Sequence, residues 1–389
     1  MTTGSLPPLS LYIHIPWCVA KCPYCDFHSL ARRGPLPEGP YIRALLDDLE
    51  HSRGGLPGRE IGTIFFGGGT PSLFSGSAIA EILEGVNRRM ALAADCEITL
   101  EANPGTIDSS RFRAFREAGV TRLSLGVQSL HDPSLRRLGR IHDAREAHNA
   151  MEAAAGAGFR SFNIDLMYGL PDQTAAQAQA DVRAVLAVDP PHLSLYELTI
   201  EAHTAFAHDP PILPSEDERM AIEEAATQTA GSAGYDRYEV SAYARPGYRC
   251  AHNLNYWRFG DYLGIGAGAH SKLTDGQGVT RVVRNTDPVG YMAGRDRIAS
   301  RRRLARRDIV FEFLLNALRL SEGFTQDVLR DRTGYDFMDL ESLWAPAVAR
   351  GLLGREHDRM YATPLGRRFL DALLAEFLTA TEILPAEAS

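Results

Sequence analysis

The sequence lacks any uninterrupted apolar run of about 18 residues, the length that a membrane-spanning helix needs. Its first residues, MTTGSLPPLS, contain neither the basic segment nor the apolar segment of a signal peptide. It also lacks an excess of positive charge, because 41 Lys and Arg face 49 Asp and Glu and the formal net charge is -8. A net negative surface repels phosphate backbones. We therefore expect a cytoplasmic protein without nucleic acid as its general partner.

Cysteine is scarce and unevenly placed. Of the five cysteines, Cys18, Cys22 and Cys25 fall within one short loop, unlike the dispersed set of a disulfide scaffold. Four thiolates normally hold a four-iron cluster. The C-x3-C-x2-C spacing therefore predicts a [4Fe-4S] cluster with one iron left open for a small-molecule ligand. The alternatives are a zinc site completed by His28, or a redox dithiol formed by the last two of these cysteines.

Short apolar or alternating runs recur along the first half of the chain, with helical patterns between them. The predicted strands are residues 11–15, 63–67, 97–103, 122–128, 162–169 and 192–198. The predicted helices are residues 40–52, 77–91, 109–118, 143–157, 174–187 and 216–231. Strand-helix-strand order favours parallel strands with right-handed crossovers. The sequence therefore predicts an α/β fold with an incomplete (β/α)6 barrel, and a doubly wound sheet is the rival.

The length of 389 residues predicts a large domain and a smaller one. We expect the barrel over residues 1–235, an extension with added strands over residues 236–299, and a mostly α-helical domain over residues 300–389. Three helical patterns, a short hairpin and a last helix are typical of a winged-helix-like domain. Its basic start, residues 300–307, would contact DNA in a regulator, but we expect a solvated linker and the start of a helix.

Polar residues follow the predicted strands at their carboxyl ends, where parallel barrels build their sites. The second strand runs into GGGTP, residues 67–71, where missing side chains let a ligand approach the backbone. Glu101, Gln128 and Asp165 lie at the ends of the next three strands, where buried acidic groups need polar partners or ligands. Each residue alone could also be a turn or helix cap. Together they predict a small-molecule site.

The cysteine loop resembles that of the radical SAM superfamily, in which C-x3-C-x2-C follows the first strand of a partial (β/α)6 barrel. The resemblance includes the aromatic Tyr24 before the last ligand. It implies that the open iron binds S-adenosylmethionine (SAM) and that an electron, supplied by a donor, cleaves a sulfonium bond of SAM. The likeness narrows to a group that contains oxygen-independent coproporphyrinogen III oxidase and related heme chaperones. The segments that carry it are YIHIP (12–16), GGGTP, SLGVQS (124–129), DLMYGLP (165–171) and the C-terminal part of the chain.

The narrower resemblance also implies which residues bind SAM. Positions matching the first SAM site are Tyr12, Tyr24, Gly68 and Glu101. Positions matching a second SAM site in the oxidase are Gly69, Thr70, Gln128, Arg140 and Asp165. The oxidase has a further cysteine two residues after the last cluster ligand, whereas this chain has Phe27, which argues against the oxidase branch.

A second feature favours the chaperone branch. The segment HNLNYW, residues 252–257, matches an HNxxYW motif that marks the chaperones. A neutral imidazole is a ligand for heme iron, and aromatic rings offer flat surfaces to a porphyrin, so His252, Tyr256 and Trp257 are the predicted heme residues. The alternative for this histidine is a hydrogen-bonded position packed at the mouth of the barrel, in contact with SAM or the cluster loop. His270 is a second candidate, and His14 is expected to be structural or near the cluster.

The resemblance implies a heme chaperone that binds a [4Fe-4S] cluster, SAM and heme, and that delivers heme to acceptor proteins such as respiratory cytochromes. We expect it to act in the cytoplasm, at the inner face of the membrane where such acceptors lie, and to form a homodimer. Two alternatives stay open. One is oxidative decarboxylation of coproporphyrinogen III, and the other is DNA binding by the C-terminal domain.

Overall fold

The structure, a computed structural model, describes residues 6–32, 34–106 and 108–381. Strand β1 shows why the first half forms a barrel wall. Leu11, Ile13 and Ile15 are fully buried and share one apolar core with helix residues such as Leu45. Because side chains alternate along a strand, the residues between them face the inside of the sheet. The six central strands are β1 (Leu9–Ile15), β4 (Ile61–Gly68), β5 (Leu92–Ala102), β6 (Arg122–Gln128), β7 (Ser161–Tyr168) and β8 (His192–Glu197).

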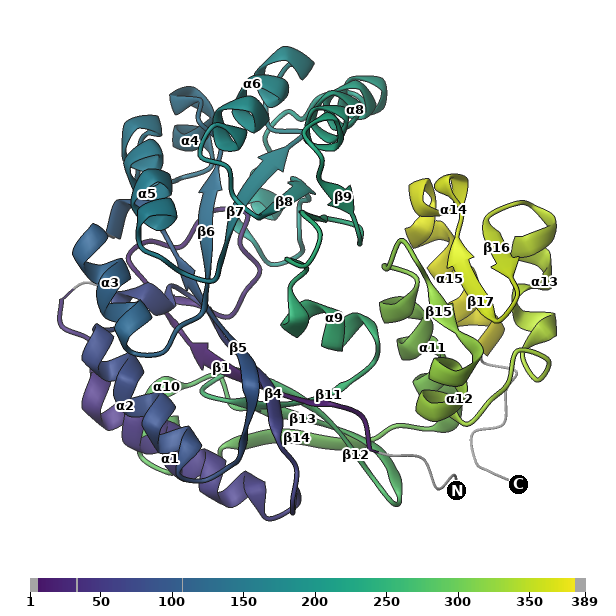
Figure 1. Cartoon of the computed structure of the whole chain (residues 1–389), viewed down its shortest axis with the longest axis horizontal. Helices are drawn as coiled ribbons and strands as arrows, with labels where there is room; N and C mark the ends of the chain where they lie inside the picture. Colours follow the sequence, from purple (N-terminus) through teal and green to yellow (C-terminus); the bar gives the residue numbers. More distant parts are fainter. Residues whose placement is uncertain (1–5, 33, 107, 382–389) are drawn as a thin grey trace.

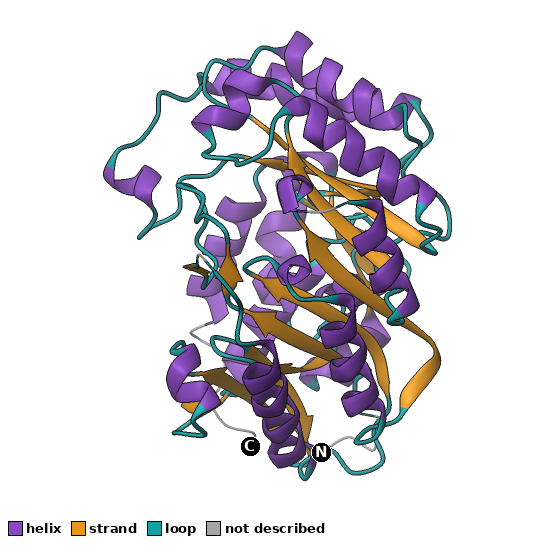
Figure 2. Cartoon of the chain, turned by 90° about the vertical axis from the view of Figure 1, so that its left-hand side faces the viewer, coloured by secondary structure: helices purple, strands orange, loops and turns teal. Residues whose placement is uncertain are grey.

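Helices follow these strands and cover the outer face of the sheet (Figures 1 and 2). Several begin with a capping box, in which the side chain of the N-cap residue and that of the glutamate or glutamine three residues later each accept a hydrogen bond from the other residue's backbone N–H. Asp143 with Glu146 and Ser215 with Glu218 are examples. The main helices are α1 (Glu38–Arg53), α2 (Gly76–Asn87), α3 (Ser109–Glu117), α5 (Ala144–Gly156), α6 (Ala175–Leu186) and α8 (Glu216–Ser232). Shorter elements are β2 (Trp17–Cys18), β3 (Leu30–Ala31), η1 (Pro71–Leu73), η2 (Pro104–Thr106), α4 (Asp132–Arg137) and α7 (Ala205–His208).

The strand order decides between the two predicted architectures. The six central strands are parallel and stand in sequence order, β1-β4-β5-β6-β7-β8. The chain therefore winds in one direction, whereas a doubly wound sheet reverses its strand order. The described sheet has two free edges and does not close. The predicted partial barrel is confirmed.

Further strands extend the sheet on both sides. Next to β1 lie β11 (Asp261–Ile265), β12 (His270–Asp275), β13 (Gly278–Arg284) and β14 (Ile298–Arg303). Next to β8 lie β10 (Ala242–Ala244) and β9 (Asp236–Arg237). The added strands that were expected within residues 236–299 thus contribute to the sheet. Residues 300–307 were expected to form a solvated linker and the start of a helix. The helix start agrees, because α11 begins at Arg306, but the linker was wrong, because β14 pairs with β13 as far as Arg303.

The last part of the chain has its own apolar core, centred on residues such as Phe313, Leu329 and Trp344. Three helices, a hairpin and two final helices follow one another, which is the predicted winged-helix-like order with the last helix divided into a short helix and a longer one. The elements are α11 (Arg306–Ala317), β15 (Phe324–Thr325), α12 (Gln326–Thr333), α13 (Glu341–Ala349), β16 (Leu353–Glu356), β17 (Arg359–Ala362), α14 (Pro364–Arg368) and α15 (Leu370–Thr381). The division of the chain at residues 235 and 299 stays a proposal. Among the described helices, none is long and apolar enough to cross a membrane.

Two short helices complete the sheet region, α9 (Ala251–Trp257) and α10 (Pro288–Met292). Helix α9 contacts β1, β4 and β11 and also α11 of the C-terminal domain. In Figure 1 it lies on the concave side of the sheet, between the barrel wall and the C-terminal domain. The HNxxYW segment therefore forms a bridge between the two parts of the molecule.

Candidate functional site

The cysteine loop leaves the end of β1 and is fixed at both ends. The carbonyl of Pro16 accepts a hydrogen bond from the N–H of Leu30 at 2.7 Å, and β2 pairs with β3. Nε2 of the buried His14 lies 2.8 Å from the carbonyl oxygen of His28, so the imidazole donates to the far end of the loop. The part between these anchors carries Cys18, Cys22 and Cys25.

The thiols are partly enclosed. Burial raises the pKa of Cys18 and of Cys25, so both groups favour the neutral thiol as long as no cation lies beside them. A bound metal reverses this preference, because a coordinating thiol is deprotonated. The third thiol has a cation beside it, since Nη1 of Arg140 lies 3.5 Å from Sγ of Cys22.

The glycine run after β4 passes directly under the cysteine loop. The N–H of Gly69 donates to the carbonyl of Ile15 at 2.8 Å, and the N–H of Thr70 donates to the carbonyl of Trp17 at 2.7 Å. A Cβ atom on Gly69 would stand 2.5 Å from that Trp17 oxygen. Gly68 has φ of +110°, which side chains disfavour. Glycine is therefore required for this close approach.

One cavity joins the cysteine loop to the carboxyl ends of the strands. The three cysteines line it together with eight of the nine residues predicted to bind SAM, Tyr24, Gly68, Gly69, Thr70, Glu101, Gln128, Arg140 and Asp165. Tyr12 is not among the lining residues. Its ring packs against Gly67, and its hydroxyl lies 3.1 Å from Nδ1 of His14. Tyr12 thus lies beside the cavity and contacts the histidine that anchors the loop.

Two buried carboxyl groups occupy the inner end of the cavity. Burial, and then the charge of Asp165, raise the pKa of Glu101 to about 8. Burial also raises the pKa of Asp165, although its oxygens accept hydrogen bonds from Ser124 at 3.2 Å and from Asn163 at 2.7 Å. Two carboxylates this close oppose each other's ionisation. The inner end can therefore hold a proton near neutral pH and bind polar groups of a ligand.

Arg140 ties the strand ends to the cysteine loop. Its Nη2 donates to the carbonyl of Gly126 at 2.7 Å and also to Oδ1 of Asn103, while Nη1 faces Cys22. Its Nε is buried without a hydrogen-bond partner among the described residues. A guanidinium held in this way presents positive charge and a free donor to the cavity.

The strand-end wall of the cavity contains four residues that were not predicted as ligands. Asn103 bonds both Thr70 and Arg140, and the hydroxyl of Tyr196 donates to Oε1 of Gln128 at 2.5 Å. Ser124 and Gly126 complete this wall. Asn103 and Gly126 lie two residues from a predicted site residue, Ser124 lies four residues from Gln128 on the same strand, and Tyr196 lies near the end of β8. The two-residue period of a strand would have identified the first three.

The zinc alternative finds little support. Nε2 of His28 lies 2.8 Å from the carbonyl oxygen of Thr286, so this nitrogen is already bonded. Within the described ranges, no three His, Cys, Asp or Glu side chains are arranged around a single ion. A cluster does not require that arrangement, because its ligands bind separate irons.

Comparison with known proteins agrees with this geometry. The sequence matches the Radical SAM superfamily over residues 12–185 and the HemN C-terminal domain over residues 304–369. The heme chaperone HemW of Escherichia coli (strain K12) is 50% identical over 375 residues, which cover 96% of this chain and 99% of that protein. This chain belongs to the HemW family. The heme chaperone HemW of Haemophilus influenzae is 46% identical, again over 96% of this chain and 99% of that protein.

More distant relatives keep the whole architecture. The mitochondrial radical S-adenosyl methionine domain-containing protein 1 of Bos taurus is 34% identical over 95% of this chain and 87% of that protein. Among solved structures, coproporphyrinogen III oxidase (HemN) from Escherichia coli superimposes with a TM-score of 0.82, at 24% identity, over 96% of this chain and 91% of that one. At this identity the match shows a shared fold.

Membership of the radical SAM superfamily implies a [4Fe-4S] cluster and SAM, and the residues of the cavity fit both. Three thiols face one end, which suits a cluster with one iron left for another ligand. The glycine run presents backbone to the same space. The unpartnered Nε of Arg140 and the carboxyl groups of Glu101 and Asp165 offer a donor and acceptors for the polar groups of SAM.

The HNxxYW segment of the HemW family lies away from this cavity, at the opposite end of the barrel. His252 is 1% exposed, and its Nδ1 lies 2.7 Å from Oγ1 of Thr63 while Nε2 lies 3.1 Å from the hydroxyl of Tyr256. Burial lowers its pKa to about 3. Both ring nitrogens are bonded and the ring is enclosed, as the packed alternative expected, but the ring does not line the cavity of the cysteine loop, so the expected place at the barrel mouth was wrong. Heme ligation by this histidine stays a prediction that its packing does not favour.

The other motif residues also make structural contacts. Nδ2 of Asn255 donates to Oγ of Ser10 and to the carbonyl of Asp261, both at 2.8 Å, and so joins α9 to β1 and β11. The guanidinium of Arg319, in the C-terminal domain, lies 4.3 Å from the ring centre of Trp257. His270 is exposed at the start of β12 and does not line the cysteine cavity. The hexapeptide therefore connects the barrel to the C-terminal domain.

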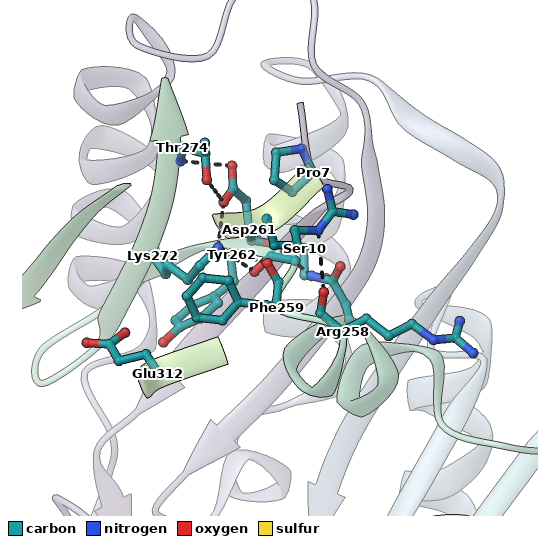
Figure 3. A network of polar contacts seen from close by, with 12 residues as sticks. Pro7, Ser10, Arg258, Phe259, Asp261, Tyr262, Lys272, Thr274 and Glu312 are labelled. Atoms are coloured by element: carbon teal, nitrogen blue, oxygen red, sulfur yellow. Dashed lines mark hydrogen bonds and ion pairs between the residues drawn. The ribbon is translucent and has the colours of Figure 1, made fainter. Parts of the chain in front are cut away.

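A buried ion network lies beneath α9 (Figure 3). Asp261 is fully buried between Lys272 at 3.0 Å and Arg59 at 2.7 Å, and it also accepts hydrogen bonds from the hydroxyl and the N–H of Thr274. Nζ of Lys272 donates further to the carbonyl of Phe259 at 3.0 Å. Each buried charge is thus paired, and the network fixes the start of β11 beside β1.

Proposed function

We propose that this chain is a heme chaperone, which binds heme and delivers it to acceptor hemoproteins such as respiratory cytochromes. The observation that carries the proposal is the 50% identity, over nearly the full length of both chains, to a protein named heme chaperone HemW. Phe27 supports it, because this aromatic residue occupies the position of the further cysteine of the oxidase.

We assign the cavity residues to two groups. Cys18, Cys22 and Cys25 would hold a [4Fe-4S] cluster. The residues that would bind SAM are Tyr24, Gly68, Gly69, Thr70, Glu101, Gln128, Arg140 and Asp165, with Tyr12 supporting them from outside the cavity. When bound, the cluster supplies an electron that can cleave a sulfonium bond of SAM.

The protein's own groups prepare the cavity for a cationic, polar ligand. Ionised Glu101 would accept hydrogen bonds from ribose hydroxyls, and Asp165 would attract the positive charge of SAM. Arg140 would bind a carboxylate group while it holds the strand ends against the cysteine loop. The same set of residues would also determine the binding of a second SAM molecule, because some of them match the first SAM site of the oxidase and the others match its second SAM site.

An anaerobic assay separates this proposal from the oxidase alternative. Reconstituted protein is supplied with reductant, SAM and coproporphyrinogen III, and in parallel with heme followed by an apo-hemoprotein. We expect heme uptake and its transfer to the apoprotein without formation of protoporphyrinogen IX. Conversion of coproporphyrinogen III at rates of a dedicated enzyme would overturn the chaperone proposal.

Partners and location follow from the same proposal. The acceptors would be respiratory hemoproteins, an electron donor would reduce the cluster, and two copies of the chain would form a homodimer. We place the protein in the cytoplasm, at the membrane face where such acceptors receive heme. The net charge of -8 for the whole chain supports the absence of nucleic acid as a general partner.

A further inference from the structure

The cavity that contains the three cysteines changes character from its inner end to its mouth. The inner end is polar and holds Glu101 and Asp165. The outer wall instead contains three large apolar side chains that remain in contact with solvent. Val19 is 40% exposed, Phe27 is 62% exposed and Ile141 is 47% exposed, and all three line the same cavity. We call these three residues the apolar rim.

The apolar rim comes from two separate parts of the chain. Val19 and Phe27 belong to the cysteine loop, whereas Ile141 follows Arg140 in the connection between α4 and α5. Single exposed apolar residues are ordinary on protein surfaces, but a group at the opening of a cavity marks a place where an apolar ligand binds.

A positive charge accompanies the apolar rim. The sequence contains only two lysines, Lys21 and Lys272, and the second is buried in the ion network beneath α9. Lys21 is exposed, lines the same cavity, and donates from Nζ to the carbonyl of Phe27 at 3.2 Å. An ammonium group therefore stands at the edge of the apolar surface, where it can pair with a carboxylate.

We propose that heme docks on the apolar rim, with one face of the porphyrin against Val19, Phe27 and Ile141 and a propionate on Lys21. This inference rests on the proposed chaperone function and gives it a site. Heme matches the surface in two ways, because it is a broad apolar plate and carries carboxylates at one edge. The apolar rim is open to solvent, whereas His252, on α9, is buried against β4 and against Tyr256 of its own helix.

The position of heme at the mouth of the cavity would affect the binding of SAM. SAM at the inner end and heme at the mouth would share one cavity, so heme would cover the exit of SAM. The two could then bind in an order, with SAM first. A loop that carries both the cluster ligands and two rim residues would also link the state of the cluster to heme affinity.

The test is a heme titration of the full-length protein after anaerobic cluster reconstitution, followed by the Soret absorption. The variants are Phe27→Ser, Ile141→Ser and Lys21→Gln, and the matched control is Phe369→Ser, an exposed phenylalanine in the C-terminal domain (49%). We expect about tenfold weaker binding for each rim variant, because each loses most of one apolar contact. Lys21→Gln should weaken binding about threefold and reduce its salt dependence. The control should bind as the wild type does.

Iron and sulfide content and SAM affinity are measured on every variant. Unchanged heme affinity in all three variants would overturn the proposal that heme docks on the apolar rim. A loss of SAM affinity with unchanged heme binding would also overturn it, because the rim would then be the site of the adenine group of SAM. If Phe27→Ser fails to assemble the cluster, Ile141→Ser decides, because it lies outside the cysteine loop. Failure of the wild type to bind heme would instead end the proposed chaperone function itself.

Discussion

Oγ1 of Thr63 lies 2.7 Å from Nδ1 of His252, although 189 residues separate them in the sequence. The contact joins β4, in the barrel wall, to α9, which bridges to the C-terminal domain. Nε2 of the same imidazole lies 3.1 Å from the hydroxyl of Tyr256. This buried histidine therefore has the bonding pattern of a residue that holds two segments together.

The first prediction concerns His252→Ala. Removing the ring leaves a cavity and takes one hydrogen-bond partner from Thr63, whose hydroxyl still donates to Ser10, and one from Tyr256, so we expect the free energy of unfolding to fall by about 2 to 4 kcal/mol. Heme affinity should stay within twofold of the wild type, because the apolar rim lies at the other end of the barrel. Urea denaturation and heme titration on the same preparation check both points. Loss of heme binding with unchanged stability would restore His252 as a ligand.

The second prediction concerns pH. Burial lowers the pKa of His14 and His142 to about 4 and that of His252 to about 3, below the ordinary value of 6.5. Between pH 6.5 and 4 these three imidazoles bind protons in the unfolded chain and not in the folded chain, so their contribution makes stability fall as pH falls, whereas Glu101, with its pKa raised to about 8, contributes in the opposite direction. Each imidazole contributes a slope of about 1.4 kcal/mol per pH unit. Denaturation at pH 7.5, 6.5 and 5.5 measures it. His252→Gln should reduce the slope by one such increment, and an unchanged slope would contradict the buried neutral state.

Much of the fold could be predicted because its local signals agree. Each central strand was found within a few residues, except that β5 begins at Leu92, five residues before its predicted start. Those extra residues have little alternation of polarity, and only their pairing beside β4 makes them a strand. The strand at Ile298–Arg303 was missed for a related reason, since arginine-rich composition indicates solvent exposure and the backbone pairing with β13 is a long-range contact.

A site residue could be predicted where a motif or its place at the end of a strand identifies it. It could not be predicted where only contacts between distant segments identify it. The strand-end residues Glu101, Gln128 and Asp165 could be chosen from position alone. Asn103 was passed over because it resembles a turn residue, and its bonds to Thr70 and Arg140 depend on segments far apart in sequence. The sequence analysis offered a packed His252 as an alternative, but it could not give its neighbours Thr63 and Phe65, since a hexapeptide does not say which part of the sheet it packs on.

The third prediction tests the close passage of the glycine run beneath the cysteine loop. In Gly69→Ala the new methyl group would overlap the backbone of Trp17, so the loop cannot close and cluster content should fall to less than one tenth of the wild-type value. The matched control is Gly276→Ala, where no atom lies within 4 Å of the added Cβ. Iron and sulfide analysis after reconstitution measures both. Full cluster content in Gly69→Ala would refute the role of this contact.

The fourth prediction concerns the protonation of Glu101. Its pKa is raised to about 8, first by burial and then by Asp165, so the group is mostly neutral at pH 7. If the ionised form accepts hydrogen bonds from SAM, affinity should rise by up to tenfold per pH unit below 8 and level off above it. Calorimetric titration of SAM between pH 6.5 and 9 gives the profile. Glu101→Gln should bind weakly and lose the pH dependence, whereas a profile that falls with pH would mean that the neutral acid is the binding form.

The fifth prediction compares two substitutions in the ion network beneath α9. Asp261 is fully buried with Lys272 at 3.0 Å and Arg59 at 2.7 Å, and burial lowers the pKa of Lys272 to about 8 despite this carboxylate. In Asp261→Ala two buried cations lose their counter-charge, so we expect a loss of about 3 to 5 kcal/mol in the free energy of unfolding. In Lys272→Met the carboxylate keeps Arg59 and Thr274, and the methionine fills the space near Phe259, so the loss should be under about 2 kcal/mol. Urea denaturation of both variants measures the difference. Equal losses would mean that burial of the lysine, and not the pairing of charges, determines the stability of this end of the barrel.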